Sequence, residues 1–441
     1  MNKKYLDVIK WLLKRLGYSK RVFFEWIDTL IYQPKSRFLL HAWNGHRTPF
    51  EMILFYNLFG RILFASREFL ALITDGKPFK KKILLEGYEE SESRDKKGSY
   101  DTLWPRSPLE NSSLNGSDKL ILSEAFKERM KKSLEIAYEV ENLSFNKTKE
   151  WERVTTVFKS SFFTENGELN EELLLNFRST SKRCEEIFGD EFYYIDKEEG
   201  YTKSYLKAID LVLSYHRSAK VINKELLASV TESSVGNSLF VNYRGQRLSE
   251  KLLFHTMIVN DILENVTFER EKRNVVVDIG SGYGGVDRLL SYYVPNTCFV
   301  LVDLPETLLL TSYFIEYNFP DKKVALLSDI IDRVDEFDSL IMEYDFIVIP
   351  PSVVEKIPNE SVNLVLNSAS LGFMEQEYIE YYLKNIYRVL KKRGCFYSLN
   401  KEYNSHLGIG NHEWDFQGEY LTKLMAYDNR FSYMQWLGEK I

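Results

Sequence analysis

The sequence predicts an α/β fold for residues 246–441, a doubly wound, mainly parallel sheet, behind a mostly helical N-terminal half. Two valine-rich apolar runs, 275–279 and 299–303, flank a glycine-rich turn, and such runs are typical of strands buried on both faces of a parallel sheet. Strand and helix patterns then alternate along the chain, which indicates strand–helix–strand units. Before this region the apolar residues recur instead on a helical period.

The chain has 441 residues and is long enough for several domains. We expect a basic helical region with a polar linker over residues 1–115, a helical middle region over 116–245, and the sheet domain over 246–441. The polar stretch has the Ser, Asn and Gly content of a linker. Residues 1–82 carry 16 Lys and Arg against 6 Asp and Glu, whereas the whole chain has a net charge of −6.

The basic segment, residues 1–84, has aromatic residues between its cations and leaves three interpretations open. In the first, the segment makes peripheral contact with an anionic membrane face. In the second, it attracts an acidic acceptor. In the third, it is a basic helical domain without a ligand. No recognition motif accompanies the charge, so we expect no nucleic-acid partner. The most hydrophobic stretch, 52–74, contains Arg61, Arg67 and Glu68 and should not span a bilayer.

We expect a cytoplasmic location, with contact to the inner membrane face through the basic segment left open. The start of the chain lacks the apolar core of a signal peptide. Its three cysteines are far apart and form no C-x-x-C pair, which suits a reducing compartment. Cys298 and Cys395 are expected to fill buried strands as small apolar residues.

The predicted elements of the sheet domain follow in order. Leu252, His255, Val259 and Ile262 share one face of a helix directly before the first strand. A helix over 306–317 follows the second strand, with Pro305 near its first turn, where a missing N–H costs nothing. The later strands are expected at 346–349, which we favour over 324–327 as the third, at 363–366 and at 395–399.

A last helix carries an apolar stripe between Ile379 and Leu390. The three cations Lys391, Lys392 and Arg393 come directly after it. Cations suit the negative end of a helix dipole, and glycine suits the position after the last turn. We therefore expect the helix to end on these cations, with Gly394 as its cap.

The glycine-rich turn reads Asp278-Ile279-Gly280-Ser281-Gly282-Tyr283-Gly284-Gly285. Glycines let the backbone turn sharply into a helix and approach a ligand without an intervening Cβ. Asp303 ends the second strand, where a carboxylate accepts hydrogen bonds from the hydroxyls of a ribose. The pair of features predicts a cofactor that bears a ribose.

Two details favour S-adenosylmethionine over a dinucleotide. Gly280, Gly282 and Gly285 also satisfy the G-x-G-x-x-G dinucleotide pattern. Asp278, however, would repel a pyrophosphate, whereas it suits the positively charged amino-acid end of S-adenosylmethionine. Gly284 completes a G-x-G-x-G run, the form typical of methyltransferases.

Residues 234–400 resemble the bacterial sugar O-methyltransferase family. The matching pieces are Val235-Gly236-Asn237, Leu253-Phe254-His255, the glycine-rich turn, Val302-Asp303-Leu304-Pro305-Glu306 and Leu366-Asn367-Ser368-Ala369-Ser370. The family usually has Glu-Met shortly after that serine, whereas this chain has Leu371-Gly372-Phe373-Met374. The resemblance implies a Rossmann-like methyltransferase domain that methylates a sugar hydroxyl in a bacterial surface polysaccharide or its precursor.

Two other functions stay open: an NAD(P)-dependent oxidoreductase acting on nucleotide sugars, and a non-catalytic cofactor-binding subunit of a glycan assembly complex. Asn367 and Ser368, at the end of the fourth strand, either bond the cofactor or its acceptor or merely close a turn. The residues expected to contact the cofactor are Asp278, Gly280, Ser281, Gly282, Tyr283, Gly284, Asp303, Leu304, Asn367 and Ser368.

An alcohol becomes a good nucleophile only when its proton leaves, so a base or a divalent metal ion is expected near the acceptor. His255 is the first candidate for the base, because it lies on the apolar helix face before the first strand and matches the family's histidine. A hydrogen-bonded core histidine is the alternative. His406, His412 and Glu413 follow the fifth strand and are alternative candidates for a base or a metal site, without a diagnostic ligand spacing.

Overall fold

The computed structural model describes residues 121–142, 161–163, 168–178, 214–216, 218–238, 240–243, 245–401, 403–404, 409–410, 420–428 and 433–441, with the single residues 156, 158 and 211. The expectations for residues 1–115, and those for His406, His412 and Glu413, lie outside the described residues. No helix in the described ranges has both the length and the apolar character needed to cross a membrane.

The described residues belong to two compact units. The first contains helix α11 (Lys224–Ser229) and the hairpin of β1 (Val241–Tyr243) and β2 (Gln246–Leu248). Gln246 is buried and ties the two together, because its Nε2 donates to the carbonyls of Leu227 at 2.9 Å and Val230 at 2.6 Å. The second unit contains an eight-stranded sheet.

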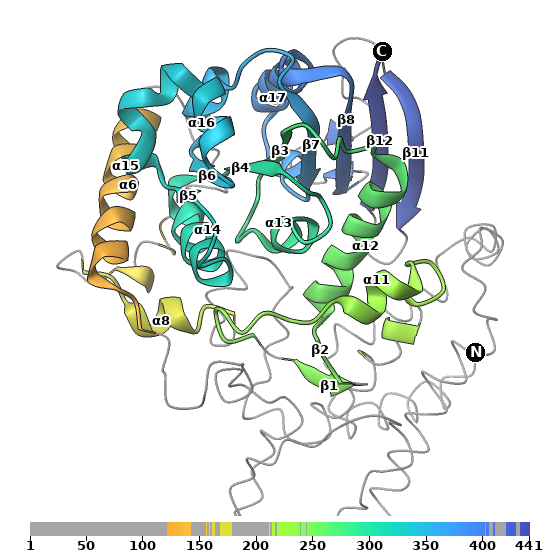
Figure 1. Ribbon diagram of the computed structural model, residues 1–441, viewed down its shortest axis with the longest axis horizontal. Helices are drawn as coiled ribbons and strands as arrows, with labels where there is room; N and C mark the ends of the chain where they lie inside the picture. Colours follow the sequence, from red (N-terminus) through yellow and green to blue (C-terminus); the bar gives the residue numbers. More distant parts are fainter. Residues whose placement is uncertain are drawn as a thin grey trace, which may run out of the picture. The chain divides into compact units, whose positions relative to one another are not determined.

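The eight strands have the spatial order β11-β12-β8-β7-β3-β4-β6-β5 (Figure 1). Their bounds are β3 Asn274–Ile279, β4 Thr297–Val302, β5 Val324–Ala325, β6 Phe346–Ile349, β7 Val362–Ser368, β8 Leu390–Lys401, β11 Tyr420–Asp428 and β12 Tyr433–Lys440. Strands β3 to β8 pair in parallel, whereas β12 is antiparallel to both β8 and β11. A short pair, β9 (Tyr403–Asn404) with β10 (Ile409–Gly410), stands apart from the sheet.

The expected doubly wound, mainly parallel sheet is confirmed. Both candidates for the third strand belong to it, as β5 and β6, and Cys298 and Cys395 are buried in β4 and β8. The hairpin of β11 and β12 was not predicted. Most of β11 is exposed, so this edge strand lacks the buried alternation by which strands are identified in a sequence.

Helices cover both faces of the sheet. The helices and 3-10 turns of this unit are α6 Glu124–Asn142, α8 Glu171–Leu175, α12 Glu250–Asn265 from Phe254 onward, α13 Gly285–Leu290, α14 Pro305–Asn318, α15 Leu327–Ile330, η4 Ile331–Glu336, α16 Phe337–Glu343, η5 Pro351–Lys356, η6 Leu371–Phe373 and α17 Gln376–Val389. Along β3, Val275, Val277 and Ile279 pack into one cluster with apolar residues of α15, α16 and α17. Because side chains alternate along a strand, Asp278 points to the opposite face.

The predicted helices α12 and α14 are confirmed, with Pro305 at the first position of α14. The expected end of the last helix was wrong. Helix α17 stops at Val389, and Leu390 already begins β8 and pairs with Val362 of β7. Pairing to the neighbouring strand therefore outweighs the local capping signal of Lys391–Arg393 and Gly394.

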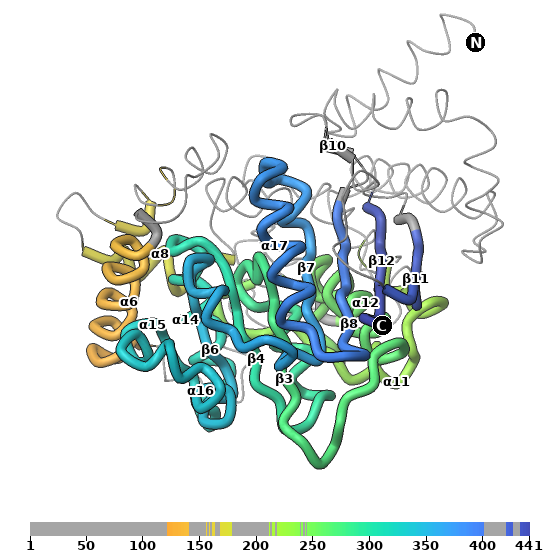
Figure 2. Tube along the Cα trace, turned by 90° about the horizontal axis from the view of Figure 1, so that it is seen from above, coloured from red at the N-terminus to blue at the C-terminus, as the bar shows by residue number. Residues whose placement is uncertain are grey.

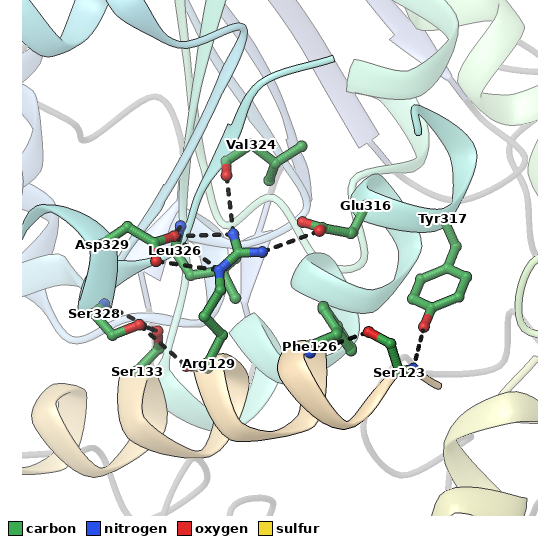
Figure 3. A network of polar contacts seen from close by, with 10 residues as sticks. All are labelled: Ser123, Phe126, Arg129, Ser133, Glu316, Tyr317, Val324, Leu326, Ser328 and Asp329. Carbon is green, nitrogen blue, oxygen red and sulfur yellow. Dashed lines mark hydrogen bonds and ion pairs between the residues drawn. The ribbon is translucent and has the colours of Figure 1, made fainter. Parts of the chain in front are cut away.

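Helix α6 packs against α14 and α15, at the β5 end of the sheet, opposite β11 and β12 (Figure 2). Arg129 makes most of the polar contacts between α6 and the sheet domain (Figure 3). Arg129 donates to both carboxylate oxygens of Asp329 at 2.9–3.1 Å, to Glu316 Oε1 at 3.0 Å and to the carbonyl of Val324 at 3.0 Å. Because the planar guanidinium donates to two carboxylates and a carbonyl at once, it fixes α6 in one orientation.

Replacing Arg129 with alanine is expected to lower the free energy of unfolding by about 1–2 kcal/mol, since a bidentate, partly buried pair is lost. Arg333→Ala is the matched control. Its partner, Glu343, lies 3.0 Å away, but this pair is more exposed, so we expect about 0.5 kcal/mol or less. Urea unfolding of the two variants measures the difference, and equal effects would contradict a special role for Arg129.

Candidate functional site

The glycine-rich turn lies where the sheet changes its direction of winding. Strand β3 sits between β4 and β7, and the chain proceeds from β3 towards β5 on one side before it returns to β7 and β8 on the other. In open α/β sheets such a switch point, at the carboxyl ends of the strands, is where ligands bind. The turn that follows β3 therefore occupies the expected position for a ligand site.

Three glycines of this turn have left-handed backbone conformations, with φ of +77° at Gly280, +56° at Gly282 and +83° at Gly284. At two of them packing also requires glycine: a Cβ on Gly280 would overlap Ser370 Oγ, and one on Gly284 would lie 2.9 Å from Ile315 Cδ1. A Cβ on Gly282 would meet no described atom within 4 Å. The turn is thus packed against other side chains at Gly280 and Gly284 and is open at Gly282.

The backbone of Gly282 is held on both sides. Its N–H donates to Asp303 Oδ2 at 2.8 Å, and its carbonyl accepts from Thr311 Oγ1. Asp303 Oδ1 accepts the N–H of Leu304 at 2.7 Å, and Thr307 also bonds this carboxylate. The side chain of Asp303 is partly exposed at the surface. Loss of solvation by burial nevertheless raises the pKa of its carboxyl to about 7, because it outweighs the hydrogen bond from the Gly282 N–H, which lowers that pKa. The carboxylate is fixed and retains acceptor positions for a ligand hydroxyl.

Asn367 is fully buried, and the protein uses all the hydrogen-bonding positions of its amide. Its Nδ2 donates to the carbonyl of Ile279 at 2.6 Å and to Ser370 Oγ, and its Oδ1 accepts from Asn400 Nδ2 and the N–H of Leu371. The side chain therefore joins the ends of β3, β7 and β8. Of the two roles weighed for it, the amide contacts favour closing the turn over touching a ligand.

Tyr283 points into the protein, and its side chain is 4% exposed. Its ring lies 4.8 Å from that of Phe314 and 5.7 Å from that of Phe177, and the guanidinium of Arg178 lies 4.9 Å above it. We therefore assign Tyr283 to anchoring the turn. Arg178 belongs to a segment about a hundred residues upstream of the turn, so no local pattern in the sequence indicated its place here.

The Val235-Gly236-Asn237 piece meets the same segment. Gly236 has φ of +78°, and a Cβ there would overlap the Phe177 ring. Its carbonyl accepts the N–H of Arg178 at 2.8 Å, and Asn237 Nδ2 donates to Asn176 Oδ1 at 2.6 Å. This piece and the end of the α8 segment form one wall behind Tyr283.

His255 lies against the turn, as expected for a residue of the site. It is buried on α12, and a Cβ on Gly285 would overlap its imidazole. Its ring centroid is 5.8 Å from that of Tyr283. The structure thus brings His255 to the first residue of α13, next to the glycine-rich turn.

Three polar side chains around the turn are buried and have oxygens without a conventional donor among the described residues. They are Asp278 (Oδ1), Ser281 (Oγ) and Asp287 (both oxygens). Burial, then the neighbouring Asp287 and Asp303, raise the pKa of Asp278, and burial raises the pKa of Asp287 to about 7. Sequence reasoning missed Asp287, whose position in the first turn of α13 looked like an ordinary helix-start acid.

Within the ranges that the structure describes, no group of three or more His, Cys, Asp or Glu side chains is arranged to hold a metal ion. Ser368 is the last residue of β7 and Leu304 directly precedes α14, and both are partly exposed. Of the candidates from the sequence, the structure brings together at the turn Asp278, Ser281, Gly282, Asp303 and His255.

No protein-family model matches the chain, and no curated protein matches it. Among solved structures it is similar to a candidate S-adenosyl-L-methionine-dependent methyltransferase from Methanococcus maripaludis, at 15% identity over 42% of this chain and 83% of that one, with a TM-score of 0.27. It is also similar to a SAM-dependent methyltransferase from Aquifex aeolicus, at 12% identity over 42% and 89%, with a TM-score of 0.27. A third is geranyl diphosphate C-methyltransferase from Streptomyces coelicolor, at 9% identity over 42% and 75%, with a TM-score of 0.29.

Proposed function

We propose that this chain binds S-adenosylmethionine at the glycine-rich turn and transfers its methyl group to a hydroxyl of a sugar. The observation that carries the cofactor assignment is the open space at Gly282, whose N–H is held by the fixed carboxylate of Asp303, next to buried acids on β3 and α13. Asp303 would hold the ribose hydroxyls, and Gly282 would let the cofactor approach the backbone. Asp278 would lie towards the cofactor's positively charged amino-acid end.

The same residues disfavour a dinucleotide. A pyrophosphate in this turn would lie beside Asp278 and Asp287, both buried where a low dielectric strengthens repulsion between like charges. An NAD(P)-dependent oxidoreductase would need cations or free N–H groups there instead. The balance of charge thus supports a cofactor that carries its own positive charge.

When bound, S-adenosylmethionine supplies an electrophilic methyl group on a positively charged sulfur. The chain must then orient the acceptor, exclude water and remove the hydroxyl proton. His255 is our candidate for taking that proton at an imidazole nitrogen, because it is the described histidine that lies against the turn. Asn367 and Tyr283 would position the turn without touching the reacting atoms.

A sugar acceptor is supported by the resemblance of residues 234–400 to bacterial sugar O-methyltransferases. Its pieces from distant parts of the chain gather around one turn: Gly236 behind Tyr283, His255 against Gly285, and Asn367 beneath Gly280. A purified protein that forms methylated sugar from surface-polysaccharide precursors would support the proposal. Binding of the cofactor without turnover on any such precursor would favour a non-catalytic subunit.

Replacing His255 with alanine is expected to lower kcat by about 10²–10⁴ while affinity for S-adenosylhomocysteine stays within about threefold, because a base acts on the acceptor rather than on the cofactor. His255→Gln, which fills the same space, should be equally slow if proton transfer is what is lost. His216→Ala is the matched control and should turn over normally. Steady-state kinetics and calorimetry measure both quantities, and normal turnover of His255→Gln would return His255 to a packing role.

A further inference from the structure

Two buried carboxyl groups face one another beside the glycine-rich turn. Asp278 is on β3, with its side chain on the face opposite to α15–α17, and Asp287 is the third residue of α13. Their side chains are 3% and 0% exposed. Each interacts with the other's carboxyl group, and Asp303 adds a further negative charge nearby.

This pair is only weakly compensated, because a backbone hydrogen bond lowers the pKa of Asp287 but burial outweighs it. Apart from the other acid and the backbone of Asp287 itself, both oxygens of Asp287 and Oδ1 of Asp278 have no hydrogen-bond partner among the described residues. Burial has the largest effect on the pKa of both acids, and the charges of Asp287 and Asp303 raise the pKa of Asp278 further. A buried charge without a partner is costly, so a fold keeps such a pair only where something else stabilises it.

We propose that Asp278 and Asp287 act together as the receptor for the α-ammonium group of the cofactor, and that the ammonium replaces a proton held by the pair. The inference rests on the proposed function and adds a residue, Asp287, and a proton to it. Ser281 lies between the two acids in the sequence, and its buried Oγ, which has no hydrogen-bond partner among the described residues, offers a further acceptor. An ammonium has three donors, one for each of the side chains of Asp278, Asp287 and Ser281.

The proton follows from the chemistry of the pair. Two carboxyl groups hydrogen-bond to each other only if one of them holds a proton, and burial favours that neutral form. The raised pKa values of both acids, about 7 for Asp287, agree with a shared proton near neutral pH. A bound ammonium favours the ionised form of both, so the proton leaves to solvent as the ligand binds. Binding should therefore strengthen as the pH rises through about 7.

The test compares two ligands on the full chain. S-adenosylhomocysteine carries the ammonium, whereas 5′-methylthioadenosine has the same adenosine but no amino-acid end. Both meet Asp303, whose pKa is also about 7, so the difference between their pH profiles isolates the ammonium end. From about pH 6 to about pH 7.5, affinity for S-adenosylhomocysteine should rise about tenfold more than affinity for 5′-methylthioadenosine. Calorimetry in two buffers of different ionisation enthalpy should show, at the lower pH, about one more proton released with S-adenosylhomocysteine than with 5′-methylthioadenosine.

Asp287→Asn should abolish that proton release and weaken S-adenosylhomocysteine by about tenfold or more near pH 7.5. Its affinity for 5′-methylthioadenosine should stay within about twofold, which also shows that the site is folded. Asp261→Asn is the matched control, since Asp261 on α12 is another acid whose pKa burial raises, to about 6, but it bonds Gln435 instead. That variant should bind both ligands normally.

Two results would overturn this inference alone: equal pH profiles for the two ligands, or an Asp287→Asn variant that binds S-adenosylhomocysteine as the unmodified protein does. Failure of the unmodified protein to bind either ligand would overturn the proposed function together with it. The two failures are therefore distinguishable in one set of titrations.

Discussion

Asp303→Ala is expected to weaken binding of S-adenosylhomocysteine by about 1.5–3 kcal/mol, the usual cost of losing a charge-assisted pair of hydrogen bonds. The carboxylate of Asp303 already fixes the N–H groups of Gly282 and Leu304, so the substitution removes a ligand contact and loosens the turn at once. Isothermal titration calorimetry measures the change, and circular dichroism checks that the variant is folded.

Two further variants separate the contributions at this position. Asp303→Asn keeps one oxygen for a backbone N–H but loses the negative charge, so its affinity should lie between those of the alanine variant and the unmodified protein. Asp321→Ala changes an exposed acid in the turn after α14 and should leave affinity unaltered. A folded Asp303→Ala protein with unchanged affinity would remove the ribose assignment.

Gly282→Ala is expected to weaken S-adenosylhomocysteine by about 10- to 100-fold, the range that overpacking of a fitted site produces. A Cβ at this position meets no described protein atom within 4 Å, and the hydrogen bonds of its N–H and carbonyl fix where that Cβ points. The added methyl group therefore takes up the space assigned to the cofactor.

Gly245→Ala provides the matched control for backbone strain. Gly245 has φ of +75° in the β1–β2 turn, and a Cβ there also meets no described atom within 4 Å. Both variants should lose about 1–2 kcal/mol of unfolding free energy, because an L-residue is strained at positive φ. Only Gly282→Ala should lose affinity. Equal affinities of the two variants would mean that no ligand occupies the space at Gly282.

The parts of the fold that sequence reasoning predicted are those whose signals are local. Strands β3 and β4 are runs of buried apolar residues on both faces, and the glycines between them have the backbone conformations that only glycine adopts easily. Helix α12 has one apolar face, on which His255 is buried with its neighbours. In each case a few consecutive residues carry the information.

The parts that it missed depend on contacts between distant residues. Strand β8 begins earlier than expected because Leu390 pairs with Val362, which no local charge pattern reveals. The role of Asn367 is set by Ile279 and Asn400, and the place of Arg178 by Tyr283. Asp287 resembles a common helix-start acid, and only its burial against Asp278 shows it as part of the site.

Whether the glycine-rich turn binds S-adenosylmethionine is decided by a titration of the unmodified protein. The purified full chain is titrated with S-adenosylhomocysteine and, separately, with NAD and NADP, in the same buffer near neutral pH. We predict saturable binding of one S-adenosylhomocysteine per chain and no measurable binding of either dinucleotide. Tighter binding of NAD or NADP than of S-adenosylhomocysteine would mean that the turn holds a dinucleotide instead.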